Sequence, residues 1–92
     1  MTQISLLADC RALRVEEIRI AAGRSEPFEA PDGIAALLFA AGEGRIVISD
    51  CAHIVREGSV ELVCLGEPCT ISASRDIHAY VVIAKQSHLA GD

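Results

Sequence analysis

Short apolar segments separated by turn-forming residues follow one another along this chain from about residue 13 to residue 84. Within most of them apolar residues recur at alternate positions, a spacing typical of β-strands rather than helices. The segments that this pattern predicts as strands are 13–21, 34–41, 45–49, 51–55, 60–65, 69–73 and 77–84. About seven or eight short strands at near-even spacing indicate an all-β fold, a small jelly-roll barrel or sandwich.

Glycine, proline and charged residues mark the boundaries between these strands. Gly42-Glu43-Gly44 is predicted to break the apolar run before it, and Arg75-Asp76 is predicted to form a turn. Segment 25–33 contains two prolines, which cannot donate to a central ladder, so it is expected to be a loop or an irregular edge. The tail from residue 85 to residue 92 is expected to be disordered at its end.

Segment 34–41 is apolar at every position, with the sequence Ile34-Ala-Ala-Leu-Leu-Phe-Ala-Ala41. A strand of this kind is covered on both of its faces. In a small barrel only one face can meet the interior. The other face is therefore predicted to meet a second copy of the chain in a homodimer.

Composition agrees with a single domain that covers part of its apolar surface by association with a second copy. The chain has 92 residues and is read as one domain over 1–92, with its core at about 13–84. It is 51% hydrophobic but contains only one Tyr and two Phe, so the core must be aliphatic. So much aliphatic surface on so small a domain also favours association.

The charge balance excludes some classes of partner. Thirteen acidic against eight basic residues give a net charge of −5, which disfavours nucleic acid because each phosphate contact needs a cation. No apolar run approaches a membrane span, and residues 4–8 lack the basic start of a signal peptide. No nucleic-acid or membrane partner is expected, and the predicted location is the cytoplasm.

The stretch from Gly58 to Ala73 resembles the second sequence motif of the cupin family. That motif reads Gly, five residues, Pro, one residue, Gly, two residues, His, three residues, Asn. Gly58 and Gly66 fall on its two glycines, whereas Cys64, Cys69 and Ala73 replace its proline, histidine and asparagine. The resemblance implies a cupin fold in which Cys69 stands where a metal-binding histidine usually lies.

The first cupin motif, His-x-His followed by Glu and a closing Gly, is less well matched. Taking Gly42 as the closing glycine places Ala35 at the glutamate and segment 28–31 at the histidines, and no histidine lies there. The resemblance therefore implies that the usual metal ligands are missing, and no cofactor is expected.

Within the cupins, segments 34–45 and 58–68 are similar to the small C-terminal domain of type I mannose-6-phosphate isomerases. The likeness rests on an aliphatic strand that ends in Glu43-Gly44 and on the Gly-rich strand and turn that follow. In that family the zinc and the catalysis belong to the other, N-terminal half. The resemblance thus implies the fold without the activity.

Zinc remains the alternative cofactor, through the cysteines and histidines. Cys64 and Cys69 flank a turn, and Cys51-Ala-His53 places a thiol and an imidazole on one strand face. This spacing is not that of closed zinc sites. Cysteines of this kind, Cys10 included, are more commonly small buried hydrophobes.

Two further groups of polar residues have alternative interpretations. Glu26, Glu29 and Glu43 could do acid–base work or be solvated loop residues, and the second is far commoner. His78 and Tyr80 share a strand face, where they could line a barrel mouth or form an interface or edge pair. Cys69 is not expected to be a nucleophile, because an aliphatic interior should raise the pKa of its thiol.

The sequence favours a metal-free, non-catalytic cupin-like module that binds or dimerises, with a sugar or another small metabolite as its ligand. The candidate pocket lies at the barrel mouth near Phe28, Glu29 and Cys69. The alternative is an enzyme similar to mannose-6-phosphate isomerase, or a separate subunit of one. If the chain is an enzyme, a sugar-phosphate isomerase is expected.

Overall fold

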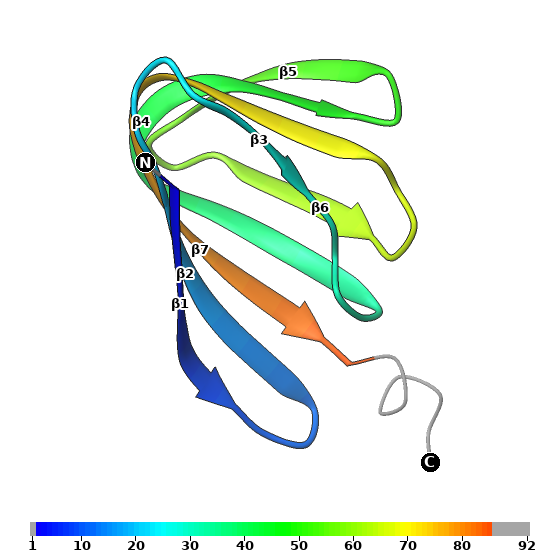
Figure 1. Ribbon diagram of the computed structural model, residues 1–92. Coiled ribbons are helices and arrows are strands. Elements are labelled where there is room, and N and C mark those ends of the chain that lie inside the picture. The colour runs from blue at the N-terminus through cyan, green and yellow to red at the C-terminus, as the bar shows by residue number, and fades with distance from the viewer. Residues whose placement is uncertain (1, 86–92) are drawn as a thin grey trace.

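The computed structural model describes residues 2–85, and these residues form seven antiparallel β-strands (Figure 1). The strands are β1 (Thr2–Asp9), β2 (Leu13–Ile20), β3 (Ser25–Phe28), β4 (Ile34–Ile48), β5 (Cys51–Arg56), β6 (Val60–Cys64) and β7 (Cys69–Ala84). The predicted all-β class is confirmed. Within the described range, no helix has the length and apolar character needed to cross a membrane.

Two long strands, β4 and β7, pair along most of their length and bend together, so one sheet folds into two layers. The large layer contains β1, β2, the second half of β7, the first half of β4, and β6. The small layer contains β3, the first half of β7, the second half of β4, and β5. The layers face each other and spread apart from the bend, so the sheet is not closed into a complete barrel (Figure 1).

The bend depends on two glycines of β4. A Cβ atom at Gly42 would overlap the carbonyl oxygen of Asp76, and one at Gly44 would overlap that of Ser72. Gly42 also has a φ of +97°, which side chains rarely tolerate. The predicted break at Gly42-Glu43-Gly44 is therefore wrong, because these glycines let β4 continue close against β7 through irregular register. The predicted turn at residues 75–76 likewise lies within β7.

The core fills the space between the two layers. It is built from alternate residues of β4 and β7 with contributions from the other strands. Its members are Ile18, Ile20, Phe28, Ala30, Ala35, Leu37, Phe39, Ile46, Val55, Val63, Cys69, Ile71, Ala73, Ile77, Ala79, Val81 and Ile83. No polar or charged residue is buried in the part of the chain that the structure describes. The alternation predicted for 77–84 is confirmed, because its odd-numbered positions are the buried ones.

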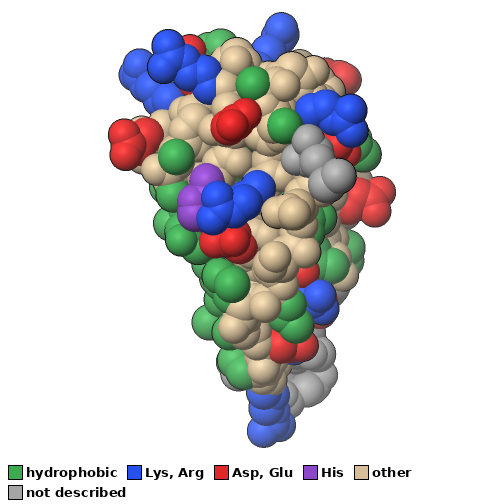
Figure 2. Space-filling model, turned by 60° about the vertical axis from the view of Figure 1, so that its left-hand side comes forward, with side chains coloured by type: hydrophobic (Ala, Val, Ile, Leu, Met, Phe, Trp, Pro, Cys, Tyr) green, Lys and Arg blue, Asp and Glu red, His purple; other side chains and the backbone are tan. Residues whose placement is uncertain are grey.

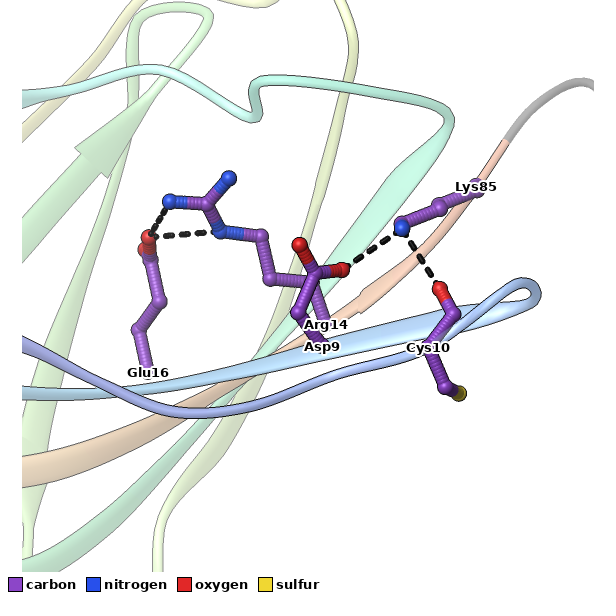
Figure 3. Close-up of polar contacts among 5 residues, drawn as sticks. All are labelled: Asp9, Cys10, Arg14, Glu16 and Lys85. Atoms are coloured by element: carbon purple, nitrogen blue, oxygen red, sulfur yellow. Dashed lines mark hydrogen bonds and ion pairs between the residues drawn. The ribbon is translucent and has the colours of Figure 1, made fainter.

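The first strand is a finding that the sequence pattern did not predict. Among residues 2–85, β1 pairs only with β2, and it exposes Ile4, Leu6 and Leu7. The end of β7 is attached to the turn between β1 and β2, because the Lys85 ammonium contacts Asp9 Oδ1 at 2.6 Å and the Cys10 carbonyl oxygen at 2.5 Å (Figure 3). β3 is a short edge strand containing a proline, as expected for that segment. The tail expected to be disordered, apart from Lys85, lies outside the described residues.

Candidate functional site

The predicted pocket residues divide between the interior and the surface. Phe28 of β3 lies directly opposite Cys69 of β7, and both side chains are buried in the core. Glu29 follows Phe28 in the chain and is exposed. The structure therefore brings Phe28 and Cys69 together as packing partners, while Glu29 lies outside the core.

The residues around this position do not fit a metal ion. Ala30 and Ala35, which stand in or near the positions of the first-motif ligands, are buried and offer no ligand atoms. Burial, followed by the charges of Glu61 and Glu67, raises the pKa of the Cys69 thiol to about 11. Zinc binds thiolate rather than thiol. The expected rise of this pKa is confirmed.

The other cysteines and histidines do not assemble into a ligand set. Cys10, Cys51 and Cys64 are exposed, so the expectation that the cysteines are buried hydrophobes is wrong for these three and holds for Cys69. His53 Nδ1 lies 2.8 Å from Glu61 Oε1, and this pair connects β5 to β6 across the open side of the sheet. Residues 2–85 hold no group of three or more His, Cys, Asp or Glu side chains placed to share a metal ion.

The acidic side chains of Glu67 and Glu26 make local structural contacts. Glu67 accepts a hydrogen bond from the Cys64 backbone N–H at 2.8 Å and another from the Ser49 hydroxyl at 3.2 Å. The hydrogen bond from Cys64 is the main cause of the lowered pKa of the Glu67 carboxyl. Glu26 accepts a hydrogen bond from the Thr2 hydroxyl at 2.7 Å. Both carboxylates are therefore engaged in local structural contacts.

The outward side of the bend carries a different arrangement. A hollow of about 470 Å³, named the bend hollow here, is lined by Gln3, Arg19, Ile20, Ala21, Ala41, Asp76, Ile77 and His78. Figure 2, which brings the side of the bend forward, shows a histidine beside basic and acidic side chains in the middle of this face. Asp76 Oδ1 accepts a hydrogen bond from the Ala22 amide at 2.8 Å, which holds the carboxylate at the corner.

His78 and Tyr80 lie on this outward face, between buried residues that point the other way. Their ring centroids are 5.0 Å apart. Glu17 of β2 contacts His78 Nε2 at 2.9 Å and the Arg19 Nε at 3.4 Å. The contact with His78 is the main cause of the lowered pKa of the Glu17 carboxyl.

Next to the bend hollow, the outward side of the large layer is apolar. This apolar outer face is formed by side chains on the outward positions of β2, β7, β4 and β6, opposite one another in the strand register. Its members are Leu13, Val15, Ile34, Ala36, Leu38, Val60, Leu62, Cys64, Tyr80, Val82 and Ala84. Leu62 is 62% exposed and Val60 57%. These members are uncharged, and Glu17, at the outward position of β2 opposite Tyr80, borders the set.

No protein-family model matches the sequence, and no curated protein matches it. Solved structures do match. An RmlC-like cupin protein from Desulfovibrio desulfuricans has a TM-score of 0.79 and 20% identity, covering 90% of this chain and 81% of that one. The cupin domain of Schizosaccharomyces pombe Cnp3 has a TM-score of 0.84 and 12% identity, covering 98% and 69%.

Salicylate 1,2-dioxygenase from Pseudaminobacter salicylatoxidans matches with a TM-score of 0.83 and 14% identity, covering 98% of this chain and 28% of the enzyme. At such low identities these likenesses define the fold. The chain is a cupin-fold protein. The finer likeness to the C-terminal domain of mannose-6-phosphate isomerases stays a prediction.

Proposed function

We propose that this chain is a metal-free, non-catalytic cupin-fold module that works by pairing with a second copy and by binding a small neutral molecule. The observation that most directly supports this is the filling of the interior. Phe28, Ala30, Ala35 and Cys69 occupy the space where the cupin motifs would place metal ligands, and all four are buried. A packed apolar interior with one protonated thiol supplies neither a metal site nor an acid–base pair.

The apolar outer face supports the homodimer. Identical subunits of net charge −5 repel each other wherever their acidic surfaces meet. This face limits that repulsion, because its members are uncharged and the bordering Glu17 is paired with His78 and Arg19. A two-fold axis would place the face against its own copy and remove side chains such as Leu38, Val60 and Leu62 from water.

The first test is metal content and activity. The purified protein should contain no stoichiometric transition metal by elemental analysis, and it should not interconvert mannose 6-phosphate and fructose 6-phosphate when zinc is added. About one zinc, iron or nickel per chain would overturn the metal-free interpretation. Zinc-dependent turnover that is abolished by a chelator and by Cys69→Ala would favour the isomerase alternative.

The second test is the oligomeric state. Sedimentation at micromolar concentration should give a dimer, and Leu62→Asp should give a folded monomer. Thr70→Asp is the matched control, because Thr70 is an exposed residue on the outward side of the small layer, and it should leave the dimer intact. A monomeric unmodified protein would contradict the homodimer. The cytoplasmic location predicted from the sequence stays a prediction.

A further inference from the structure

We infer that the bend hollow binds a neutral polyhydroxylated molecule such as a sugar ring. This inference deepens the proposed function and rests on the part of it that concerns ligand binding. It assigns that ligand to the outward side of the bend, although the sequence suggested the barrel mouth near Phe28, Glu29 and Cys69. The interior is packed, whereas the bend hollow is open to solvent and has about 470 Å³ of space, a size typical of small-molecule sites.

The strand register places the polar groups of the hollow in one row. Gln3 of β1 lies opposite Arg19 of β2, Arg19 lies opposite His78 of β7, and His78 lies opposite Ala41 of β4. Residues directly opposite in antiparallel strands point to the same side. The row therefore crosses four neighbouring strands, with Asp76 at its corner.

Contacts from neighbouring residues hold these groups in place before any ligand arrives. Glu17 contacts both His78 and Arg19, at 2.9 Å and 3.4 Å, and the Ala22 amide fixes one oxygen of Asp76 at 2.8 Å. Because a carboxylate only accepts hydrogen bonds, His78 Nε2 carries the proton that it donates to Glu17. Groups positioned in this way lose little freedom when a ligand binds.

The mixture of donors and acceptors selects hydroxyl groups. Arg19 offers donors, Asp76 offers acceptors, and the Gln3 amide offers both. A hydroxyl can donate and accept, so a molecule with several hydroxyls can match both kinds of partner. The exposed Ala41 lines the same hollow and can contact the carbon face of a ring.

The charges of the hollow oppose a charged ligand. Arg19 and Asp76 both line it, so a cation meets the guanidinium and an anion meets the carboxylate, with the Glu17 carboxylate close by. The neighbouring hollow, of about 410 Å³, differs because Glu43, Arg56, Glu57 and Arg75 place four charged side chains around it. A neutral polar ligand therefore fits the bend hollow best.

A titration followed by two-dimensional ¹H–¹⁵N NMR tests the site. The full chain is titrated with mannose, glucose, galactose and myo-inositol, and mannose 6-phosphate serves as the charged comparison. At least one neutral compound should shift the amide signals of Gln3, Arg19, Ala41 and His78 in a saturable manner, and mannose 6-phosphate should bind at least severalfold more weakly than mannose. Failure of all four neutral compounds to shift these signals would overturn the inference.

A larger side chain in the bend hollow tests whether the ligand binds there or elsewhere on the protein. Ala41→Leu should weaken binding at least tenfold, because the larger side chain occupies the space of the ligand, whereas Ala40→Leu, at an exposed neighbour that does not line the hollow, should leave it within twofold. If Ala41→Leu does not fold, Gln3→Ala serves instead and should weaken binding severalfold. Unchanged affinity in the variant used, or shifts centred on Phe28 and Cys69, would contradict the site. A protein that dimerises without metal but binds none of the compounds would refute this inference while leaving the pairing proposal intact.

Discussion

The two halves of the β4–β7 pair share one kind of inner face and differ in their outer faces. On both sides of the bend the inward residues are apolar, for example Leu37 in the large layer and Ile71 in the small layer. On the outward side, the large layer presents Leu38 and Val82, whereas the small layer presents Thr70 and Ser72. Folding of two layers requires only the inner faces to be apolar. The apolar outer face of one layer is therefore additional to what the fold needs, and the proposed homodimer rests on it.

Neighbouring leucines on opposite faces of β4 give the largest expected contrast. Leu37→Asp should unfold the domain, because a carboxylate at a fully buried position without a partner costs more than about 4 kcal/mol. Leu38→Asp, at a side chain that is 39% exposed, should leave a folded monomer. Circular dichroism and sedimentation distinguish the two outcomes. Unfolding by both variants would remove the distinction between the faces.

The bend that separates the halves should be the next most sensitive place. Gly42→Ala should cost several kcal/mol, on the order of 2–4, because the added methyl group meets the β7 backbone. Gly23→Ala is the matched control. Gly23 also has a positive φ, of +83°, but nothing lies within 4 Å of an added Cβ, so about 1 kcal/mol is expected. If urea unfolding gave equal losses of unfolding free energy for the two variants, the positive φ alone would account for the requirement for glycine at position 42.

A moderate effect is expected inside the small layer. Cys69→Ser should leave the fold in place and cost about 1–3 kcal/mol, because a hydroxyl replaces a thiol at a buried position. In the unmodified protein at pH 8, Cys69 should be alkylated more slowly than the exposed Cys10, Cys51 and Cys64, since its pKa of about 11 leaves it protonated. Mass spectrometry of the alkylated peptides gives the order. Rapid labelling of Cys69 would contradict the packed interior.

The smallest effect concerns the outward side of the bend. The pKa of Glu17 is lowered from 4.5 in the folded state, chiefly by its hydrogen bond with His78, so its contribution to stability is present above pH 4.5 and is lost as the pH falls through the folded-state pKa. Glu17→Gln should therefore reduce the fall in melting temperature between about pH 6 and pH 3. Glu29→Gln, at an exposed glutamate without an ion pair among residues 2–85, serves as the control. An unchanged pH profile in Glu17→Gln would show that the Glu17–His78 contact does not stabilise the fold.

Strands whose buried positions alternate regularly could be predicted from the sequence. An exposed edge strand and a strand that continues through closely packed glycines could not. Segments 51–55 and 60–65 were placed within one residue at each end, because turns bound them closely. The strand β1 was missed because Ile4, Leu6 and Leu7 follow no single period and are all exposed. The break expected at Gly42 was wrong because the glycine allows a close approach of two strands, and a turn and a close approach demand the same residue.

The position of Cys69 could be interpreted from the sequence, whereas the bend hollow could not. The burial of Cys69 and the direction of its pKa shift followed from the motif and the apolar strand around it. The bend hollow did not, since Gln3, Arg19, His78 and Ala41 are far apart in the chain. They become neighbours only through the register of four strands and the irregular pairing of β4 with β7 at the bend. No local pattern in the sequence encodes that register.

The continuity of β4 and β7 through both layers has a mechanical consequence. In a sandwich whose layers are joined only by loops, one layer can slide over the other. Here two unbroken strands run through both layers, so a change in the gap at the open end requires a change in their curvature as well as in the core packed between the layers. A ligand or a subunit contact that holds the bend in one conformation therefore also restricts the separation of the two layers at the open end.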